Sequence, residues 1–392
     1  MKYKHKAVVL GTNYYIGLAV VRNLGRNGVQ VTTVDYEPSH YGVSKYVNER
    51  LIAPHYKNDE KNLVEFLIDY SKKQSAKPVL FPTADLYVEF MENNFDALKE
   101  YYLWPNDQKG LLTELMDKES LLKYTEPLNI PTPEIIPMDD PNLYARATEE
   151  LGYPCVLKPR DSMPFVNLYR EKMFFINSEA ELREKMEICK KDNQDVFVQR
   201  IVKGPESNCY SFDMYMQDNE VKAFLTTSKI RQWPINFGAS TYAKQEYIPE
   251  LYDLCSPLFK SVNYKGFAEV ELKRDERNNK IYLVEVNVRF INFTEMLCQL
   301  GFNSPMMYFL DSLGEKVSGA QIRKNTETHW KYKYEDIPAI KRYLSTGQMT
   351  WGKIISDYRF KKVSSTWASD DIGPGWTFFK WAISSKLKRM FK

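Results

Sequence analysis

The sequence predicts an α/β protein that begins with a parallel sheet and continues into domains of α+β type. Residues 6–36 show a strand pattern, a glycine turn, an amphipathic helix and a second strand, which is typical of parallel sheets. Residues 62–83 repeat the order of helix and strand, whereas residues 266–290 form two alternating strands joined by a polar loop. A chain of 392 residues with 43% hydrophobic content is long enough for two or three domains.

Composition excludes several classes of function. The 54 basic and 51 acidic residues are too balanced for nucleic-acid binding by the whole chain, so we expect no nucleic-acid partner. Five widely spaced cysteines form no CxxC pair or zinc motif, and no apolar run resembles a signal peptide or a membrane span, which favours the cytoplasm. Only four histidines occur, without an HExxH or GxSxG motif, so carboxylates, lysines and arginines must carry the chemistry, as in phosphoryl transfer.

The glycine turn near the N-terminus lies in a Rossmann-like context without the dinucleotide fingerprint. Gly11 and Gly17 bracket "TNYYI", and no middle glycine lets a pyrophosphate approach the backbone. Asp35 ends the second strand, where a ribose contact would fall, so a nicotinamide-dependent reductase that binds its cofactor through residues 9–36 stays an alternative. We interpret the turn as structural or as a contact for a substrate that is not a nucleotide.

A second group of elements begins near residue 115. The segment 115–136 predicts a helix with Asp117 as its N-cap, followed by a strand. In "GYPCVLKPRDS" an apolar strand ends at Lys158. Considered without its neighbours, Lys158 is interpreted as a solvated residue at the end of a strand. The segment 195–216 predicts a strand, a glycine turn and another strand, with polar side chains at the junction: Gln199, Arg200 and Glu206.

The strand in "KIYLVEVNVRFIN" has one apolar and one polar face. Successive side chains of a strand alternate, so Glu285, Asn287 and Arg289 share a face. A surface strand of an antiparallel sheet would show the same alternation. In the predicted hairpin of residues 266–290, however, Glu269 and Glu271 can oppose this polar face.

The order of these elements resembles the ATP-grasp superfamily over about residues 1–320. The segments that carry the resemblance are the Rossmann-like start, "DKESLLKYTEPLNIPTPE", "PCVLKP", "VQRIVKGPES" and "GFAEVEL…YLVEVNVRF". Within the superfamily the chain is similar to carboxylate-amine ligases of the D-aspartate ligase type, which join an amino acid to a peptidoglycan precursor. The resemblance implies a Rossmann-like pre-ATP-grasp domain at 1–113, an ATP-grasp domain at 114–322 with a lid at about 150–197, and a C-terminal extension at 323–392.

The resemblance also implies which residues bind ATP. Lys118 and Lys158 would hold its phosphates, because each lysine supplies a compact positive charge. No glycine occurs between Lys158 and Gly204, so Ser162 or backbone amides would replace the glycine-rich loop of many members. The remaining matches are the hinge that grips adenine and the acid that binds the ribose hydroxyls: Gln199, Arg200 and Val202 for the hinge, and Glu206 for the acid.

By the same resemblance Glu271, Glu285 and Asn287 are magnesium ligands, since hard oxygen donors suit Mg²⁺ that bridges phosphates. Two magnesium ions are implied, with Mn²⁺ as an alternative metal. Arg289 would stabilise charge on the phosphoryl group in flight or on the intermediate. Arg231, in "TTSKIRQWPINFGAST", is our candidate for holding a substrate carboxylate with its guanidinium fork, the alternative being a solvent-exposed loop arginine.

The implied activity is an ATP-dependent carboxylate-amine ligase. The γ-phosphoryl group passes to a small carboxylate, an amine attacks the acyl phosphate, and an amide, ADP and phosphate result. An amino acid and a cell-wall precursor are the implied partners. A noncatalytic nucleotide-binding protein is the other alternative, and it would require damaged metal ligands, whereas all three are intact here.

The last segment of the chain, residues 376–392, contains no acidic residue. On a helix one stripe would be apolar and the opposite side would carry lysines and a serine. Such a basic amphipathic helix can lie on an anionic membrane, which would give the protein a peripheral location at the inner face. The alternative is a helix docked on its own domain. The apolar stripe comprises Phe379, Ile383, Leu387, Met390 and Phe391, and the other side Lys380, Ser384, Lys388 and Lys392.

Overall fold

The computed structural model describes residues 2–236 and 238–390, without the side chains of Ser162, Met163 and residues 385–390. The chain forms two compact units. The first unit comprises Met1–Tyr124, Pro205–Leu272 and Glu285–Lys392, and the second comprises Thr125–Gly204 and Lys273–Val284. In this division the segment after residue 322 belongs to the same unit as the N-terminal sheet, and the sequence-based domain boundaries stay a prediction.

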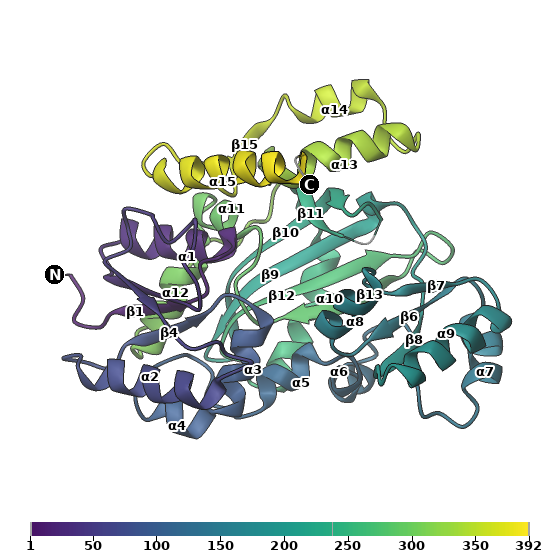
Figure 1. The fold of residues 1–392 in the computed structure, drawn as a ribbon, viewed down its shortest axis with the longest axis horizontal. Helices are drawn as coiled ribbons and strands as arrows, with labels where there is room; N and C mark the ends of the chain where they lie inside the picture. Colours follow the sequence, from purple (N-terminus) through teal and green to yellow (C-terminus); the bar gives the residue numbers. More distant parts are fainter. Residues whose placement is uncertain (1, 237, 391–392) are drawn as a thin grey trace. The chain divides into compact units, whose positions relative to one another are not determined.

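The first unit begins with the predicted parallel sheet, in the order β3-β2-β1-β4. Its buried, apolar strands match the hydrophobic runs of the sequence. Figure 1 shows α1 on one face of this sheet and α2 on the other. The elements are β1 (Ala7–Leu10), α1 (Tyr15–Arg26), β2 (Val31–Asp35), β3 (Glu49–Ile52), α2 (Glu60–Lys72), β4 (Val79–Pro82), α3 (Asp85–Asn93), α4 (Phe95–Lys99), α5 (Leu111–Met116) and α6 (Lys118–Thr125).

A larger sheet has the strand order β13-β12-β9-β10-β11-β14-β15. Helix α10 packs on one face of β9, where Phe212 contacts Tyr252. Tyr215 lies on the opposite face and donates a hydrogen bond to Asp311 of α12 at 2.8 Å. The elements are β9 (Cys209–Gln217), β10 (Glu220–Trp233), β11 (Ala239–Gln245), α10 (Pro249–Ser261), β12 (Gly266–Arg274), β13 (Ile281–Asn287), α11 (Thr294–Gln299) and α12 (Ser304–Ser312).

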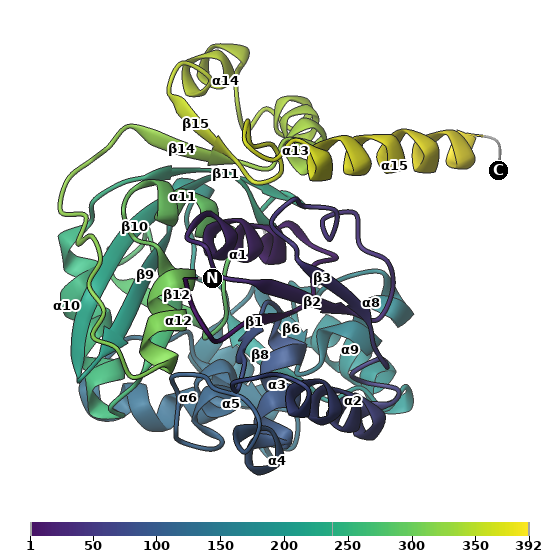
Figure 2. The same ribbon diagram turned by 90° about the vertical axis from the view of Figure 1, so that its left-hand side faces the viewer.

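The C-terminal extension adds two strands to this sheet. Strand β14 pairs antiparallel with β11, and β15 pairs parallel with β14. The fully buried Trp330 of β14 packs against Phe293 and Tyr15, which places this strand in the core of the first unit. The elements are β14 (Thr328–Lys331), α13 (Lys333–Ser345), α14 (Trp351–Asp357), β15 (Lys361–Ser364) and α15 (Gly373–Met390), and Figure 2 shows their arrangement.

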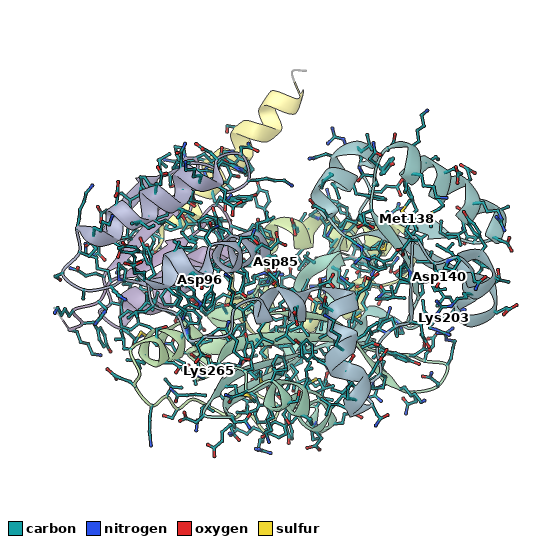
Figure 3. The ribbon with its side chains drawn as sticks, turned by 90° about the horizontal axis from the view of Figure 1, so that it is seen from below. Asp85, Asp96, Met138, Asp140, Lys203 and Lys265 are labelled. Carbon is teal, nitrogen blue, oxygen red and sulfur yellow. The ribbon has the colours of Figure 1, made fainter. Side chains whose placement is uncertain are left out.

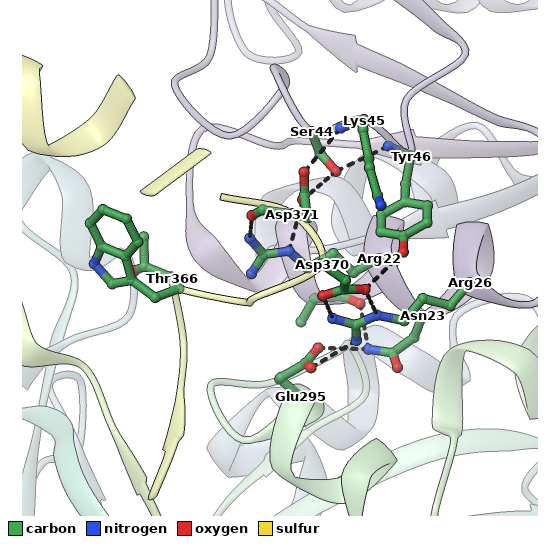
Figure 4. A network of polar contacts seen from close by, with 12 residues as sticks. Arg22, Asn23, Arg26, Ser44, Lys45, Tyr46, Glu295, Thr366, Asp370 and Asp371 are labelled. Atoms are coloured by element: carbon green, nitrogen blue, oxygen red, sulfur yellow. Dashed lines mark hydrogen bonds and ion pairs between the residues drawn. The ribbon is translucent and has the colours of Figure 1, made fainter. Parts of the chain in front are cut away.

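The connection between β15 and α15 is fastened to helix α1 by ion pairs (Figure 4). Arg22 is buried and donates from Nε to Asp371 at 2.9 Å. One turn further along α1, Arg26 binds Asp370 at 2.8 Å and Glu295 at 2.8 Å. The start of the C-terminal helix therefore has a fixed place on the N-terminal sheet layer.

The second unit contains a four-stranded antiparallel sheet in the order β5-β8-β6-β7. A separate hydrophobic core holds this unit together, with Leu157, Leu182 and Val198 fully buried. Ser178 caps α9 by accepting a hydrogen bond from the backbone N–H of Glu181 at 3.3 Å. The elements are β5 (Ile135–Pro137), α7 (Leu143–Arg146), β6 (Cys155–Pro159), α8 (Ser162–Tyr169), β7 (Phe174–Ile176), α9 (Glu179–Lys191) and β8 (Val196–Arg200).

The predicted strands and helices are confirmed in type and order, including the hairpin of β12 and β13. The five cysteines all lie within the described residues, and each is a free thiol. Within residues 2–236 and 238–390, no helix has both the length and the apolar character that a membrane span requires.

Candidate functional site

The polar face of the larger sheet gathers charged side chains from several strands of the first unit, and β9 lies between the two strands β10 and β12. Lys229 on β10 reaches Glu271 on β12, with 2.6 Å between its Nζ and Oε2 of the glutamate. Burial is the largest single influence and would lower the pKa of Lys229, but the charge and hydrogen bond of Glu271, together with Cys209 and Glu269, raise that pKa overall. A fully charged ammonium group is therefore fixed beside one of the predicted metal ligands.

Lys118 contacts a second predicted metal ligand, Glu285. Asp117 accepts a hydrogen bond from the backbone N–H of Ser120 at 2.8 Å, which confirms the predicted N-cap and fixes the first turn of α6. Lys118 begins this helix, and its Nζ lies 3.4 Å from Oε1 of Glu285. The charge of Glu285 raises the pKa of Lys118 despite burial, with a further contribution from Glu271. Lys118, Glu271 and Glu285 thus belong to one electrostatic group.

Asn287 and Glu269 form the buried part of this face. The amide of Asn287 donates to Oε2 of Glu269 at 3.0 Å. Burial, and secondarily the charge of Glu271, raise the pKa of Glu269 to about 8. Burial also raises the pKa of Asp213 on β9, so protons are held at this face near neutral pH. The alternation read from the sequence therefore places Glu269, Glu271 and Asn287 together as expected.

Arg289 follows β13 and binds Asp85, the first residue of α3 after β4. Asp85 is labelled in Figure 3. The Nε and one terminal nitrogen of Arg289 donate to the two carboxylate oxygens at 2.9 and 3.2 Å, a bidentate arrangement. The guanidinium is only 18% exposed, so its direction is fixed by the carboxylate. Asp85 stands at the carboxyl end of a parallel strand, the edge at which such sheets bind ligands.

The predicted metal ligands are oxygen donors of the kind Mg²⁺ prefers. Among the residues the structure describes, no group of three or more His, Cys, Asp or Glu side chains is arranged to hold a metal ion. The predicted set contains two carboxylates, Glu271 and Glu285, completed by the amide of Asn287, and both carboxylates contact lysines. The donor chemistry therefore fits Mg²⁺ together with anionic phosphates that the same lysines could bind.

The second unit carries five further predicted ATP contacts. Lys158 on β6 donates to the side-chain oxygen of Gln199 on β8 at 2.8 Å, because the two strands are neighbours in the sheet. Arg200 ends β8 and forms an ion pair with Glu134 at 2.5 Å. Val202, just beyond, is buried. The structure thus brings Lys158 and the predicted adenine hinge together, while the side chain of Ser162 lies outside the described residues.

Glu206 belongs to the first unit and is held by neighbouring groups. It accepts a hydrogen bond from the backbone N–H of Asn236 at 2.5 Å and another from the hydroxyl of Tyr343 on α13. These contacts fix the carboxylate at the start of β9. A ribose contact by Glu206 stays a prediction.

Arg231 does not occupy the place expected from the sequence. It is fully buried, and its guanidinium forms ion pairs with Asp336 at 2.7 Å and Asp357 at 2.8 Å. It also stacks over the ring of Tyr242 at 4.2 Å. With its donors bound by two carboxylates, Arg231 fastens α13 and α14 to β10 and has no free fork for a substrate carboxylate. The expectation of a substrate contact is corrected accordingly.

A β-bulge in β10 explains this difference. The pairing of β10 with β11 shifts between Lys229 and Arg231 and again between Arg231 and Gln232. A bulge reverses the face on which the following side chains lie. Lys229 consequently faces Glu271, whereas Arg231 turns to the C-terminal helices. Lys229 was not predicted as a site residue, and the one signal for it is its place on the same strand as Arg231.

The turn between β1 and α1 is filled by atoms of the protein itself, which pack closely against one another. A side chain at Gly17 would clash with the carbonyl oxygen of Gly11, since an added Cβ would lie 2.2 Å from it. Asp35 accepts hydrogen bonds from the backbone N–H and the hydroxyl of Thr12, at 2.5 and 2.6 Å. This packing agrees with the interpretation of the turn as structural.

Comparison with known proteins gives one relative and several similar folds. No family model matches the chain. The D-aspartate ligase of Enterococcus faecium (strain Aus0004) is 24% identical over 271 residues, which cover 64% of this chain and 62% of the relative. The chain therefore spans less than two thirds of the length of that relative.

Among solved structures, the L-amino acid ligase of Bacillus licheniformis superposes with a TM-score of 0.61 and 13% identity, covering 80% of this chain and 75% of that one. The biotin carboxylase domain of the Hydrogenobacter thermophilus 2-oxoglutarate carboxylase, solved with MgADP, ADP and bicarbonate, gives a TM-score of 0.62 and 15% identity. The shared part covers 83% of this chain and 73% of that domain. These similarities establish the arrangement of the sheets as that of the ATP-grasp fold.

Proposed function

We propose that this chain, which has the ATP-grasp fold and resembles a D-aspartate ligase, is an ATP-dependent carboxylate-amine ligase that releases ADP. The observation that carries the proposal is the polar face on which Lys118 and Lys229 contact Glu285 and Glu271. Alternating cations and carboxylates at one place suit a nucleotide whose phosphates and metal ions carry the opposite charges.

ATP is held, in this proposal, by the residues that the family resemblance selects. Lys118 and Lys158 neutralise its phosphates. Gln199, Arg200 and Val202 border the adenine, and Glu206 accepts from the ribose hydroxyls. Glu271, Glu285 and Asn287 would hold Mg²⁺, whose chemistry is to neutralise and align phosphate oxygens. Lys229 supplies a further positive charge for the phosphates, and the family resemblance did not imply this residue.

Arg289 acts on the charge that develops during the reaction. The substrate carboxylate attacks the γ-phosphorus, a new P–O bond forms, and the bond to the β-phosphate oxygen breaks to release ADP. The amine, after losing its proton, attacks the acyl carbonyl, and phosphate leaves as the amide forms. Asp85 holds the Arg289 guanidinium in one direction, which provides a preorganised partner for the acyl phosphate.

An amino acid and a cell-envelope precursor are the proposed substrates, on the strength of the D-aspartate ligase relative. The test is a screen of D- and L-amino acids for ADP release, with and without cell-wall precursors. ADP release that requires one amino acid and one precursor would support the proposal. Reduction of a nicotinamide cofactor without ATP turnover would reject it, and the closed turn at Gly11 and Gly17 gives no support to that alternative.

A further inference from the structure

Exposed apolar side chains are concentrated in the C-terminal extension. Among the described residues, eleven of the fifteen large hydrophobic side chains that are exposed lie after residue 333. All four exposed tryptophans belong to this group: Trp351, Trp367, Trp376 and Trp381. Large apolar surfaces on a folded protein mark places of interaction with another molecule or with a membrane.

Helix α15 has two apolar sides, and only one of them is covered. Phe378 and Ala382, four residues apart, are buried. The ring of Phe378 stacks on Tyr41 at 5.3 Å and meets Tyr334 edge-on at 4.6 Å. The helix is therefore docked on its own unit, as one of the two sequence-based interpretations predicted.

Another side of α15, together with the residue just before the helix, carries what we call the exposed stripe: Ile372, Trp376, Phe379 and Ile383. The spacing of three and four residues places these side chains in one row along the helix. Trp376, Phe379 and Ile383 are 50%, 46% and 46% exposed. In the sequence the same spacing continues to Leu387 and Met390, whose side chains lie outside the described residues.

The aromatic part of the exposed stripe is held in place. Gly375 lets the ring of Trp367 approach the helix, because an added Cβ would lie 2.6 Å from that ring. Trp367 contacts Trp376 edge-on at 5.5 Å, and Trp376 contacts Phe379 at 5.9 Å. The ion pairs of Asp370 and Asp371 with α1 fix the segment from which these rings project (Figure 4).

The charge of the C-terminal segment indicates which kind of molecule binds this apolar surface. Residues 328–392 contain thirteen basic and five acidic residues, whereas residues 1–327 contain 41 basic and 46 acidic residues. Four of the five acids are bound by arginines: Asp336 and Asp357 by Arg231, Asp370 by Arg26 and Asp371 by Arg22. The fifth, Glu335, is half-buried. The outward charge of this segment is therefore strongly positive.

Several basic side chains of this segment are exposed, including Lys341, Arg359, Lys361 and Lys380. A second copy of the chain is disfavoured as the partner, because a twofold interface would place this positive surface against itself. An anionic bilayer supplies both the negative charge and the apolar layer, and tryptophan rings favour the boundary between headgroups and acyl chains. We propose that the exposed stripe and its basic surroundings bind the surface of an anionic membrane.

The test is co-sedimentation of the full chain with vesicles. One set contains equal parts of phosphatidylglycerol and phosphatidylcholine, and the other contains phosphatidylcholine alone. The original chain should bind the anionic vesicles and release at high salt. The variant Trp376→Gln/Phe379→Gln/Ile383→Gln should bind at least about tenfold more weakly, since binding scales with the apolar area inserted.

A matched control removes equally exposed apolar side chains elsewhere: Ile52→Gln/Leu168→Gln/Phe175→Gln. This control should bind like the original chain. Lys380→Gln should weaken binding by up to about fivefold at low salt and have no effect at high salt. If the triple variant unfolds at a lower temperature than the original chain, the single variant Trp376→Gln is used in its place in the co-sedimentation measurement.

Equal binding to charged and neutral vesicles, or unchanged binding of the triple variant, would overturn the proposal. A chain that sediments as a dimer and becomes a monomer in the triple variant would also overturn it, because a second copy would then cover the exposed stripe. The measurement needs no substrate, so its outcome is independent of the proposed ligase activity.

Discussion

Asp85 and Arg289 are joined by two hydrogen bonds, at 2.9 and 3.2 Å, between both carboxylate oxygens and two guanidinium nitrogens. The two residues are 204 positions apart in the sequence, and they follow strands of two different sheets. This pair connects the carboxyl end of β4 with the end of the strand that carries Glu285 and Asn287.

Asp85→Asn should therefore impair catalysis by releasing the Arg289 side chain. We expect kcat for ADP release to fall on the order of a hundredfold, because a misdirected guanidinium no longer stabilises the charge that develops during the reaction. The KM for ATP should change little, because Arg289 acts late in the reaction. Asp96→Asn is the matched control, since Asp96 pairs with Lys109 on an exposed part of the first unit (Figure 3). A change in the KM for ATP alone would contradict a positioning role.

Glu285→Gln and Asn287→Ala should abolish magnesium-dependent ADP production while the fold is retained. Each substitution removes an oxygen donor of the proposed metal set. ADP release is measured against magnesium concentration, and the fold is checked by circular dichroism. Glu276→Gln, in the exposed loop between β12 and β13, should behave like the original chain. Near-normal turnover of either site variant would remove that residue from the metal set.

Lys158→Ala should raise the KM for ATP and lower kcat, because the phosphates lose a positive partner. The substitution also removes the hydrogen bond that fixes the Gln199 side chain. The measurement is steady-state ADP release over a range of ATP concentrations, with the exposed Lys172→Ala of the same unit as control. Unchanged ATP kinetics would assign Lys158 a structural role on its strand.

Arg231→Ala should destabilise the protein by about 3–5 kcal/mol, the usual cost of leaving buried charges without their partner. Asp336 and Asp357 would lose their common cation. The measurement is denaturant unfolding, and adding Asp336→Asn and Asp357→Asn should recover part of the loss. A stable Arg231→Ala protein with a raised KM for the carboxylate substrate would instead restore the sequence-based expectation.

His329 should make the protein less stable in mild acid. Burial lowers its pKa from 6.5 to about 4, and neighbouring lysines add to the effect while Asp357 opposes it. The unfolded chain takes up a proton below pH 6.5, whereas the folded chain does so only near pH 4, so stability is lost as the pH falls through this range. The loss is about 2 kcal/mol at about pH 5. His329→Gln should flatten this part of the profile, measured by unfolding at each pH, and an unchanged slope would exclude His329 as its source.

Local patterns predicted the fold class, the elements and a large part of the candidate site. Strand alternation alone put Glu285 and Asn287 on one face, and a capping residue at Asp117 fixed where the helix of Lys118 begins. These features depend on neighbours in the sequence, which is why they could be read without the structure.

The remaining features depend on contacts between distant residues. The bulge next to Arg231 turns its side chain towards Asp336 and Asp357, and it leaves no mark in the sequence that alternation can detect. The pairing of Asp85 with Arg289 joins segments far apart in the chain. Strands β14 and β15, within the predicted C-terminal extension of residues 323–392, were not predicted, because four-residue strands carry little periodic signal and their pairing is not local.

Strands β14 and β15 lie at one edge of the seven-stranded sheet. Their position affects folding during synthesis and the choice of a shortened chain for expression. Until residue 331 has left the ribosome, β11 presents unpaired backbone groups to solvent, and an open strand edge of this kind promotes aggregation. Expression of residues 1–322 as an isolated catalytic fragment would leave the same edge open permanently. A shortened chain should therefore end after Asp371, where the last arginine pairs are still intact.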